Sequence, residues 1–244
     1  MDPSKAMIEE AERITDESKI DNIMFMESSA EKLADIEDGT ADCIVSGEAA
    51  HWFDMDKVWP EFGRCLRQGG TVALWGYCDS AIVDHPKVTE LLNKYCYNQD
   101  KKFMGSYWEQ PGRNILRDLY RSIEPPNGLF EDVVRREYVP NRERKASASD
   151  AKDDEKVERP MIEKEMTLEE LGNYIRTFSA YHNWAEENKD RKPRKQGGSG
   201  DLIDDMFKEV LELESFAGVS ERINWDEAKV KIQWGTVIVM ARRK

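Results

Sequence analysis

The spacing of apolar residues along the chain predicts an alternation of short strands and amphipathic helices. Apolar runs at residues 23–26 and 42–46 are too short for helices and predict buried strands. Residues 59–67 follow a helical spacing, and residues 71–76 form a further apolar run. Strand, helix and strand in this order indicate a parallel α/β unit.

Local signals set the limits of several of these elements. Ser4 is a suitable N-cap for an amphipathic helix over residues 5–13. Pro60 is tolerable only in the first turn of the helix at 59–67, because proline lacks the backbone N–H that an inner turn needs. Gly69 and Gly70 predict a turn ahead of the strand at 71–76.

The remainder of the chain continues the pattern and includes two polar interruptions. Further helices are predicted at 87–97, 113–123, 167–184 and 201–216, and further strands at 130–138 and 230–242. The 167–184 helix begins at a capping box formed by Thr167 and Glu170. Residues 141–164 and 186–200 are polar and predict flexible insertions. We therefore expect a single α/β domain over residues 1–244.

Charge and cysteine content exclude several classes of protein. The 244 residues include 36 Lys and Arg against 49 Asp and Glu, giving a formal charge of −13. This balance argues against nucleic acid or an anionic membrane as a partner, because both need clustered cationic charge. No apolar run is long enough to span a bilayer, and no secretory signal is visible. The four scattered cysteines indicate neither a zinc site nor a disulfide framework, so we expect a reduced, cytoplasmic protein without a metal.

The most informative segment follows the predicted strand at 42–46. His51 and Trp52 lie where a strand ends and a loop begins, and open α/β sheets bind ligands at the carboxyl ends of their strands. The indole could pack against a ligand while the imidazole forms a hydrogen bond with it. The alternative is that Trp52 and Phe53 are core residues and that His51 is merely hydrogen-bonded.

Several motifs together resemble a known family. They are residues 2–7 (DPSKAM), 29–31 (SAE), 50–54 (AHWFD), 66–77 (LRQGGTVALWGY), 107–113 (YWEQPGR), 174–184 (YIRTFSAYHNW) and the ending around Trp234. In this order they are similar to the class I S-adenosylmethionine-dependent methyltransferases, and more narrowly to the trans-aconitate methyltransferase-like branch. The resemblance implies a Rossmann-like α/β sheet with helical cap insertions and S-adenosylmethionine as the cofactor.

The resemblance also implies roles for individual residues near the cofactor. Asp2 matches the acidic residue that accepts hydrogen bonds from the ribose hydroxyls. Without the resemblance, Asp2 would be interpreted as a solvent-exposed residue of the N-terminus. The loop that reads the adenine edge corresponds to Ser29, Ala30 and Glu31, with serine where the family often has aspartate. The loop that borders the methionine part corresponds to Ser46, Gly47 and Glu48. His51 and Trp52 would face the substrate.

One expected part of the family pattern is missing. The glycine-rich turn after the first strand would lie upstream of Asp2, together with the first two strands and the first helix. Glycine-rich residues 197–200 follow a charged linker and do not replace it. Two explanations compete, an incomplete sequence of a working enzyme and a degenerate protein that no longer catalyses. The intact remaining motifs favour the first.

The reaction that the resemblance implies is methyl transfer to a carboxylate of a small polycarboxylic acid. An ionised carboxylate needs no general base, so alignment is the task and no catalytic residue is required. Arg113 and Arg176 could anchor the anion in bidentate geometry, the alternative being surface ion pairs. The pocket walls could be formed by Tyr107, Trp108, Tyr181, His182 and Trp184, each of which could instead be a core residue. The oligomeric state stays open.

Two other classes of function are weighed against this one. A non-catalytic interaction protein or fragment with a methyltransferase outline would not bind the cofactor. A nucleic-acid methyltransferase is weakened by the acidic balance and by the lack of a basic aromatic stripe.

Overall fold

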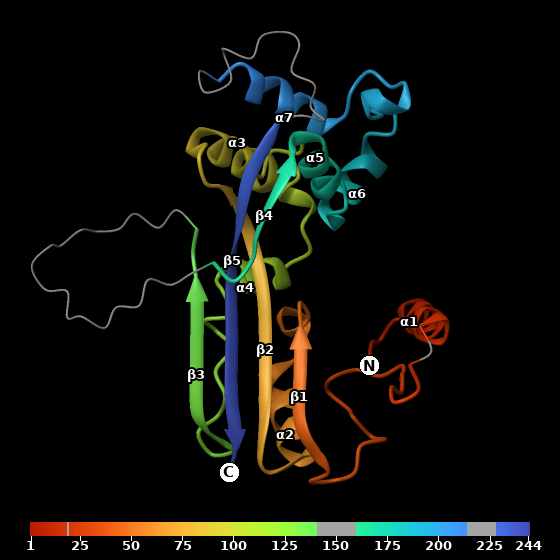
Figure 1. The fold of residues 1–244 in the computed structure, drawn as a ribbon, viewed down its shortest axis with the longest axis vertical. Coiled ribbons are helices and arrows are strands. Elements are labelled where there is room, and N and C mark those ends of the chain that lie inside the picture. The colour runs from red at the N-terminus through yellow and green to blue at the C-terminus, as the bar shows by residue number, and fades with distance from the viewer. Residues whose placement is uncertain (19, 141–159, 214–227) are drawn as a thin grey trace, which may run out of the picture. The chain divides into compact units, whose positions relative to one another are not determined.

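The computed structural model of the chain describes residues 1–18, 20–140, 160–213 and 228–244. Contacts divide the chain into two compact units (Figure 1). Unit 1 comprises Met1–Gly76, Tyr120–Arg136 and Ile238–Lys244, and unit 2 comprises the described residues of Tyr77–Leu119 and Glu137–Val237. The helices are α1 (Lys5–Glu17), α2 (Met55–Cys65), α3 (Pro86–Tyr97), α4 (Gly112–Arg117), α5 (Leu168–Arg176), α6 (Ser179–Glu187) and α7 (Leu202–Leu211). The strands are β1 (Ala41–Gly47), β2 (Leu66–Ile82), β3 (Phe130–Tyr138), β4 (Glu163–Thr167) and β5 (Lys229–Arg243).

The strands of the described residues form a mixed sheet. Its order is β1-β2-β5-β3, and β4 pairs with β5. β1 runs parallel to β2, with Ile44 opposite Val72 and Gly47 opposite Trp75, whereas β4 is antiparallel to β5. The parallel β1–α2–β2 arrangement confirms the α/β unit that the hydrophobic pattern predicts.

Helix α2 crosses from β1 to β2 because one of its faces is apolar. Val58, Trp59, Phe62 and Cys65 recur at helical spacing and are almost completely buried. The predicted start at residue 59 was wrong, since the helix begins at Met55. Pro60 therefore lies in the second turn, where its missing N–H leaves one backbone hydrogen bond unmade.

The predicted turn before the second strand is instead part of β2. The strand starts at Leu66, directly after α2, and its register moves from Leu66 opposite Ala41 to Thr71 opposite Cys43. The extra residues of β2 between these pairs form an irregularity at which Gly69 has a φ of +73°. Glycine adopts this left-handed conformation without steric cost, so Gly69 here accommodates a bulge within a longer strand.

The prediction of a buried strand at residues 23–26 was wrong. Ile23 and Met24 are exposed, at 50% and 79% of their accessible surface. Among the described residues, the only pairing next to this segment is an isolated parallel bridge between Asp2 and Glu27. The N–H of Asp2 donates to the carbonyl of Met26 at 3.2 Å. An apolar run becomes a buried strand only when neighbouring strands cover it, and a single bridge does not supply them.

Unit 2 holds the larger hydrophobic core. Helices α3, α5, α6 and α7 gather around it (Figure 1), and α7 contacts both α3 and α5. Trp184, Leu171 and Phe207 are almost completely buried in this core. The core explains why the short helices α5, α6 and α7 are stable, because helices of ten residues or fewer depend on tertiary packing of an apolar face.

Helix boundaries in unit 2 differ from the sequence prediction. The helix predicted over residues 167–184 is two helices, α5 and α6, separated at Thr177 and Phe178. The helix predicted over 113–123 ends at Arg117, because Leu119 and Tyr120 adopt positive φ angles that an α-helix cannot contain. In contrast, α3, β3 and the capping box of Thr167 with Glu170 are confirmed.

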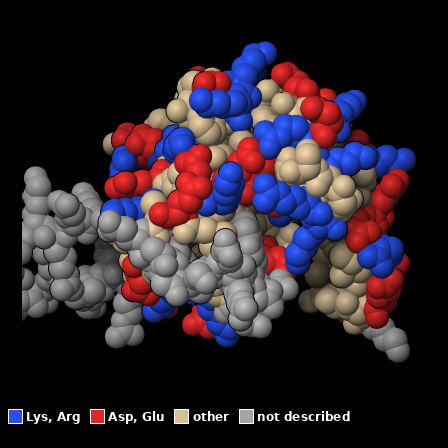
Figure 2. Space-filling view, turned by 90° about the horizontal axis from the view of Figure 1, so that it is seen from above, with Lys and Arg blue, Asp and Glu red and all other residues tan. Residues whose placement is uncertain are grey.

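The two predicted polar insertions have different outcomes. Residues 141–159 lie outside the described residues, whereas Glu163 and Lys164 already belong to β4. Segment 186–200 is described and contains a 3-10 turn at Arg194–Gln196. None of the helices in the described ranges is long and apolar enough to cross a membrane. Figure 2 shows acidic and basic side chains interspersed over one face of the described residues, without a broad surface of one sign.

Removing the capping hydroxyl of α5 tests the local account of unit 2. Thr167 accepts a hydrogen bond from the N–H of Glu170 at 3.1 Å, and Glu170 accepts one from the N–H of Thr167 at 2.8 Å. We expect Thr167→Ala to lower the free energy of unfolding by about 1 kcal/mol, since the N–H of Glu170 loses its ordered acceptor. Thr167→Ser, which keeps the hydroxyl, should retain most of that stability in urea unfolding. Equal losses in the two variants would contradict the capping role.

Candidate functional site

The loop that follows β1 is the first candidate site, and the parallel ladder sets its position. Gly47 pairs with Trp75 at the carboxyl end of β1, and the N–H of Glu48 donates to the Trp75 carbonyl at 3.0 Å. A Cβ atom on Gly47 would lie 2.6 Å from the Trp75 ring, so this position accepts only glycine without a shift. Glu48 has a φ of 55°, a conformation that non-glycine residues adopt rarely and mostly at functional sites.

His51 and Trp52 follow in a short 3-10 turn of the same loop. His51 is buried, and its Nδ1 lies 3.2 Å from the hydroxyl of Tyr120. The Trp52 ring lies 4.8 Å from the His51 ring and stays 51% exposed. His51 therefore agrees with the alternative that it is merely hydrogen-bonded. The exposure of Trp52 does not agree with a core position. Whether the pair contacts a substrate stays a prediction.

Tyr120 is a residue of this site that the sequence did not reveal. It lies 69 positions from His51, is completely buried and has a φ of 56°. The guanidinium of Arg135 donates to its carbonyl at 3.0 Å and to that of Ile123 at 2.9 Å, which holds this unusual turn in place. No motif or periodicity marks such a long-range partner.

The predicted adenine loop lies against the same region of unit 1. The carboxylate of Glu31 accepts a hydrogen bond from the N–H of Asp54 at 3.0 Å. Burial alone raises the pKa of Glu31, but hydrogen bonds from backbone groups and from Ser29 outweigh it and lower the pKa below its usual value. The carboxylate therefore stays ionised and ties residues 29–31 to the loop after β1.

Asp2 lies beside the start of the adenine loop. Its backbone bridge to Glu27 is completed by the N–H of Ser28, which donates to the Asp2 carbonyl at 3.1 Å. One oxygen of its carboxylate accepts from the N–H of Ser4 at 2.8 Å. In unit 1, backbone contacts thus link Asp2 to Ser28, and Glu31 links residues 29–31 to the loop after β1.

The remaining candidate residues belong to unit 2 and form two separate clusters. Arg113 lies over the ring of Trp108, with 4.1 Å between its Cζ atom and the ring centre. Nearby, Tyr107 donates a hydrogen bond from its hydroxyl to Glu187 at 3.0 Å, and the indole N–H of Trp108 donates to the Cys96 carbonyl at 2.8 Å. Tyr107, Trp108 and Arg113 therefore form one neighbourhood.

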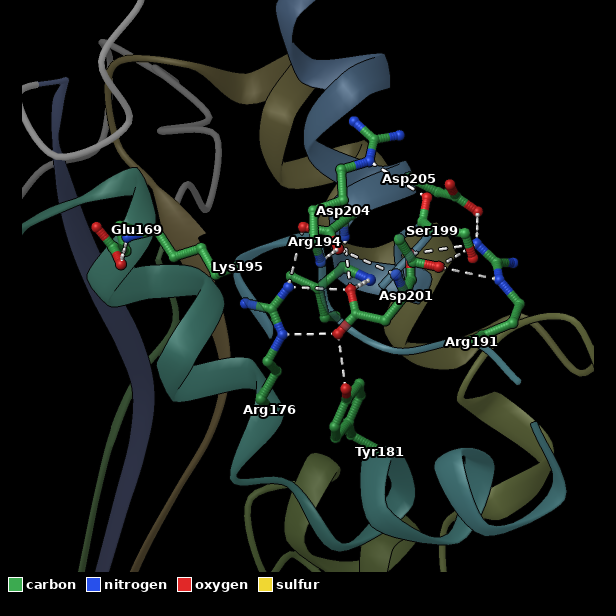
Figure 3. Close-up of polar contacts among 12 residues, drawn as sticks. Glu169, Arg176, Tyr181, Arg191, Arg194, Lys195, Ser199, Asp201, Asp204 and Asp205 are labelled. Atoms are coloured by element: carbon green, nitrogen blue, oxygen red, sulfur yellow. Dashed lines mark hydrogen bonds and ion pairs between the residues drawn. The ribbon is translucent and has the colours of Figure 1, made fainter. Parts of the chain in front are cut away.

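Arg176 belongs to the second cluster, which is centred on Asp201 (Figure 3). The Arg176 guanidinium donates to the two carboxylate oxygens of Asp201, from Nε at 2.7 Å and from Nη2 at 2.9 Å. Tyr181 donates to the same carboxylate at 2.6 Å, as do the N–H groups of Ile203 and Asp204 at the start of α7. The side chain of Asp201 is completely buried. This geometry gives Arg176 and Tyr181 a structural role in joining α5 and α6 to α7.

The last two candidate side chains differ in exposure. Trp184 is buried in the unit 2 core, stacked on Tyr181 at 6.0 Å, which matches the core alternative. His182 is exposed on the same helix. Across residues 1–18, 20–140, 160–213 and 228–244, no group of three or more His, Cys, Asp or Glu side chains is placed to hold a metal ion.

Comparisons with known proteins agree with this architecture. Residues 1–74 match the family described as a methyltransferase domain. A Saccharomyces cerevisiae protein named a probable S-adenosylmethionine-dependent methyltransferase is 28% identical over 249 residues, covering 100% of this chain and 77% of that protein. A Dictyostelium discoideum protein named as a methyltransferase is 31% identical over 135 residues, covering 55% of this chain and 46% of that protein.

A solved structure shares the fold. It is described as a type II methyltransferase from Anaeromyxobacter dehalogenans and superposes with a TM-score of 0.61 at 18% identity, covering 98% of this chain and 77% of that chain. The described strands and helices thus share the α/β fold of that structure, and residues 1–74 are similar to the methyltransferase-domain family. The similarity to the yeast protein extends over the whole of this chain.

Removing Arg176 should destabilise the fold. Arg176→Ala leaves the buried Asp201 carboxylate without its cation, and breaking such a pair costs about 3–5 kcal/mol. We expect a lower Tm for this variant by calorimetry. Lys189→Ala, which removes an exposed pair with Glu186 from the same unit, should leave the Tm nearly unchanged. Equal Tm values for Arg176→Ala and wild type would show that the ion pair does not stabilise the fold.

The Asp201 cluster should also make stability depend on acid pH. Burial raises the pKa of Asp201, but Arg176, Tyr181 and the N–H of Asp204 outweigh it, so the folded-state pKa lies below the usual value. The stabilisation is then complete above the unfolded-state pKa of about 3.9 and is lost as the pH falls through the lower folded-state value. Asp201→Asn should therefore lose less Tm than wild type between about pH 5 and about pH 2.5. Parallel Tm curves for the two proteins would contradict this assignment.

Proposed function

We propose that this chain is an S-adenosylmethionine-dependent methyltransferase that acts on a carboxylate oxygen of a small polycarboxylic acid, as trans-aconitate methyltransferases do. The observation that carries the proposal is the loop after β1, which follows a parallel strand and packs against residues 29–31 through Glu31 and Asp54. The methyltransferase-domain match over residues 1–74 includes β1, the loop after it and residues 29–31.

An unfilled polar group at this place supports a cofactor site. The hydroxyl of Ser46 is buried and has no hydrogen-bond partner among the described residues. A buried polar group without a partner is costly, and a bound molecule with polar groups would remove that cost. Ser46, Gly47 and Glu48 would hold the methionine part, Asp2 the ribose, and Ser29, Ala30 and Glu31 the adenine.

The chemistry asks little of the protein beyond alignment. When bound, S-adenosylmethionine supplies an electrophilic methyl group on a sulfonium sulfur. A carboxyl group with a pKa of about 4 is ionised at neutral pH, so no side chain has to remove a proton from the acceptor. The loop after β1, including His51 and Trp52, then has to orient the acceptor and exclude water.

The acidic chain needs a local cation to admit an anionic acceptor. Of the two predicted arginines, Arg176 has its donors directed at Asp201 and Asp204. Arg113 contacts one carboxylate, that of Asp79, at 3.5 Å. We therefore assign the anchoring role to the Arg113 neighbourhood, with Tyr107 and Trp108 beside it, and leave Arg176, Tyr181 and Trp184 to the fold. The substrate-binding role of His182, whose ring lies 6.0 Å from that of Tyr181, stays a prediction.

Calorimetric titration with S-adenosylmethionine tests the proposal. We expect saturable binding by the wild-type chain and binding weaker by about tenfold or more in Gly47→Ala, because the added Cβ atom displaces the Trp75 ring or the loop. Gly128→Ala is the matched control, since a Cβ atom there meets nothing within 4 Å. Methyl transfer to trans-aconitate, followed by mass spectrometry of the ester, tests the acceptor class.

The same titration decides between the two classes of function. Absence of binding to the folded wild-type chain would refute the enzyme and favour the non-catalytic alternative. Binding with equal affinity in all three proteins would remove the loop after β1 from the cofactor site. Cofactor binding without transfer to any polycarboxylic acid would keep the methyltransferase and overturn the acceptor.

A further inference from the structure

Asp79 is the centre of a second ionic cluster in unit 2. Its carboxylate accepts hydrogen bonds from the Tyr97 hydroxyl at 2.5 Å and from Nε of Arg117 at 2.9 Å. Nη2 of Arg113 lies 3.5 Å from the same carboxylate and also donates to the Tyr97 hydroxyl. Two guanidinium groups thus converge on one carboxylate, which leaves one positive charge in excess.

Two aromatic rings support these guanidinium groups. Cζ of Arg117 lies 3.6 Å from the centre of the Tyr97 ring, and Cζ of Arg113 lies 4.1 Å from that of Trp108. The two rings are themselves stacked, with 6.2 Å between their centres. Rings that lie against planar cations hold them in a fixed orientation at a small entropic cost. The arginine pair is therefore preorganised.

The backbone at Asp79 is strained. Its φ is 26° near the carboxyl end of β2, within a strand, where an extended residue is expected. Such a conformation costs about 1–3 kcal/mol and persists only where surrounding contacts enforce it, often at a binding site. Here the enforcing contacts are those with Tyr97, Arg113 and Arg117.

The cluster has more donors than acceptors. Nε of Arg113 is buried without an acceptor in the described part of the chain. Asp79 contacts Arg117 only through Nε, so the described residues provide no acceptor for its two terminal nitrogens. Tyr97 adds no negative charge, because burial raises the pKa of its hydroxyl well above the usual value. The side chain of Arg117 is 36% exposed, which leaves its guanidinium accessible from solvent.

The Asp201 cluster shows the opposite balance. There, Arg176 is shared between the carboxylates of Asp201 and Asp204, and the buried Asp201 accepts five hydrogen bonds. That cluster is saturated and has no excess cation. Of these two clusters, it is the Asp79 cluster that combines an excess positive charge, unused donors and access from solvent.

We propose that Arg113 and Arg117, held by Asp79 on the Tyr97 and Trp108 rings, form a binding site for a carboxylate group of a small di- or tricarboxylic acid. The terminal nitrogens of Arg117 provide the bidentate contact, and Arg113 provides the second charge. Asp79 is a positioning residue that fixes both guanidinium groups. This assignment rests on the proposed function, because the bound acid is the acceptor of the proposed methyl transfer. Arg113 and Arg117 would then select the acid.

Calorimetric titration of the full chain with trans-aconitate, citrate and succinate tests the site, with trimethyl trans-aconitate and inorganic phosphate as control probes. We expect at least one acid to bind saturably, more weakly as salt increases, and neither control to compete with it. Arg117→Ala should weaken that binding by about tenfold or more while leaving the affinity for S-adenosylmethionine unchanged. Arg191→Ala removes the same charge from unit 2, where Arg191 pairs with Asp205 at similar exposure, and should bind the acid as wild type does.

Two results would overturn the inference. One is that none of the three acids binds to the wild-type chain. The other is that Arg117→Ala, with a wild-type Tm, binds the acid as tightly as wild type does. If Arg117→Ala fails to fold, Arg117→Lys takes its place and should show weaker binding, because a lysine cannot form the bidentate contact. The separate titration with S-adenosylmethionine shows whether the proposed function fails as well.

Discussion

The parallel ladder between β1 and β2 is the constraint on which the candidate cofactor site depends. Because Gly47 pairs with Trp75, the loop after β1 starts at a fixed place, and the absence of a side chain on Gly47 lets it approach the Trp75 ring. Glu31 then joins a second segment to that loop through the N–H of Asp54. Without the ladder, none of the residues near the loop would be held in position for a ligand.

The two ionic clusters of unit 2 show how similar residues acquire different roles. Asp201 is completely buried, so its carboxylate needs every donor that surrounds it, and the cluster joins three helices. Asp79 is 30% exposed and is shared by two arginines. The cluster therefore has guanidinium donors without an acceptor and one positive charge in excess. Burial and the count of charges distinguish a structural ion pair from a site that can receive an anion. The chemical nature of the side chains does not distinguish the two, because both clusters consist of arginine, aspartate and tyrosine.

Local signals in the sequence predicted local structure well. Strand β3 lies at the predicted residues 130–138. The predicted capping residue Thr167 precedes α5, and the helix predicted from residue 201 has its N-cap at Asp201. These features depend on neighbours a few positions apart. Pro60 and Gly69 were misjudged because a helix start and a strand irregularity depend on packing and register, which the local pattern does not contain.

Long-range partners could not be predicted from the sequence. Arg176 was expected to meet a substrate, yet its partner Asp201 is 25 positions away in the chain, where the sequence indicates only the start of a helix. Tyr120 and Asp79 were not singled out at all, since neither belongs to a motif. The resemblance to a family supplied the candidate cofactor residues of unit 1, which periodicity alone would not have identified. Their arrangement became evident only when the ladder and the Glu31 contact were known.

Hydrogen–deuterium exchange with and without S-adenosylmethionine tests most directly whether unit 1 holds the cofactor. The account predicts slower exchange of the amides in residues 29–31 and 46–54 when the cofactor is present. The amides of α5 and α6, which the Asp201 cluster holds together, should exchange at the same rate in both conditions. Protection confined to α5 and α6, or unchanged exchange at the loop after β1 under saturating cofactor, would contradict it.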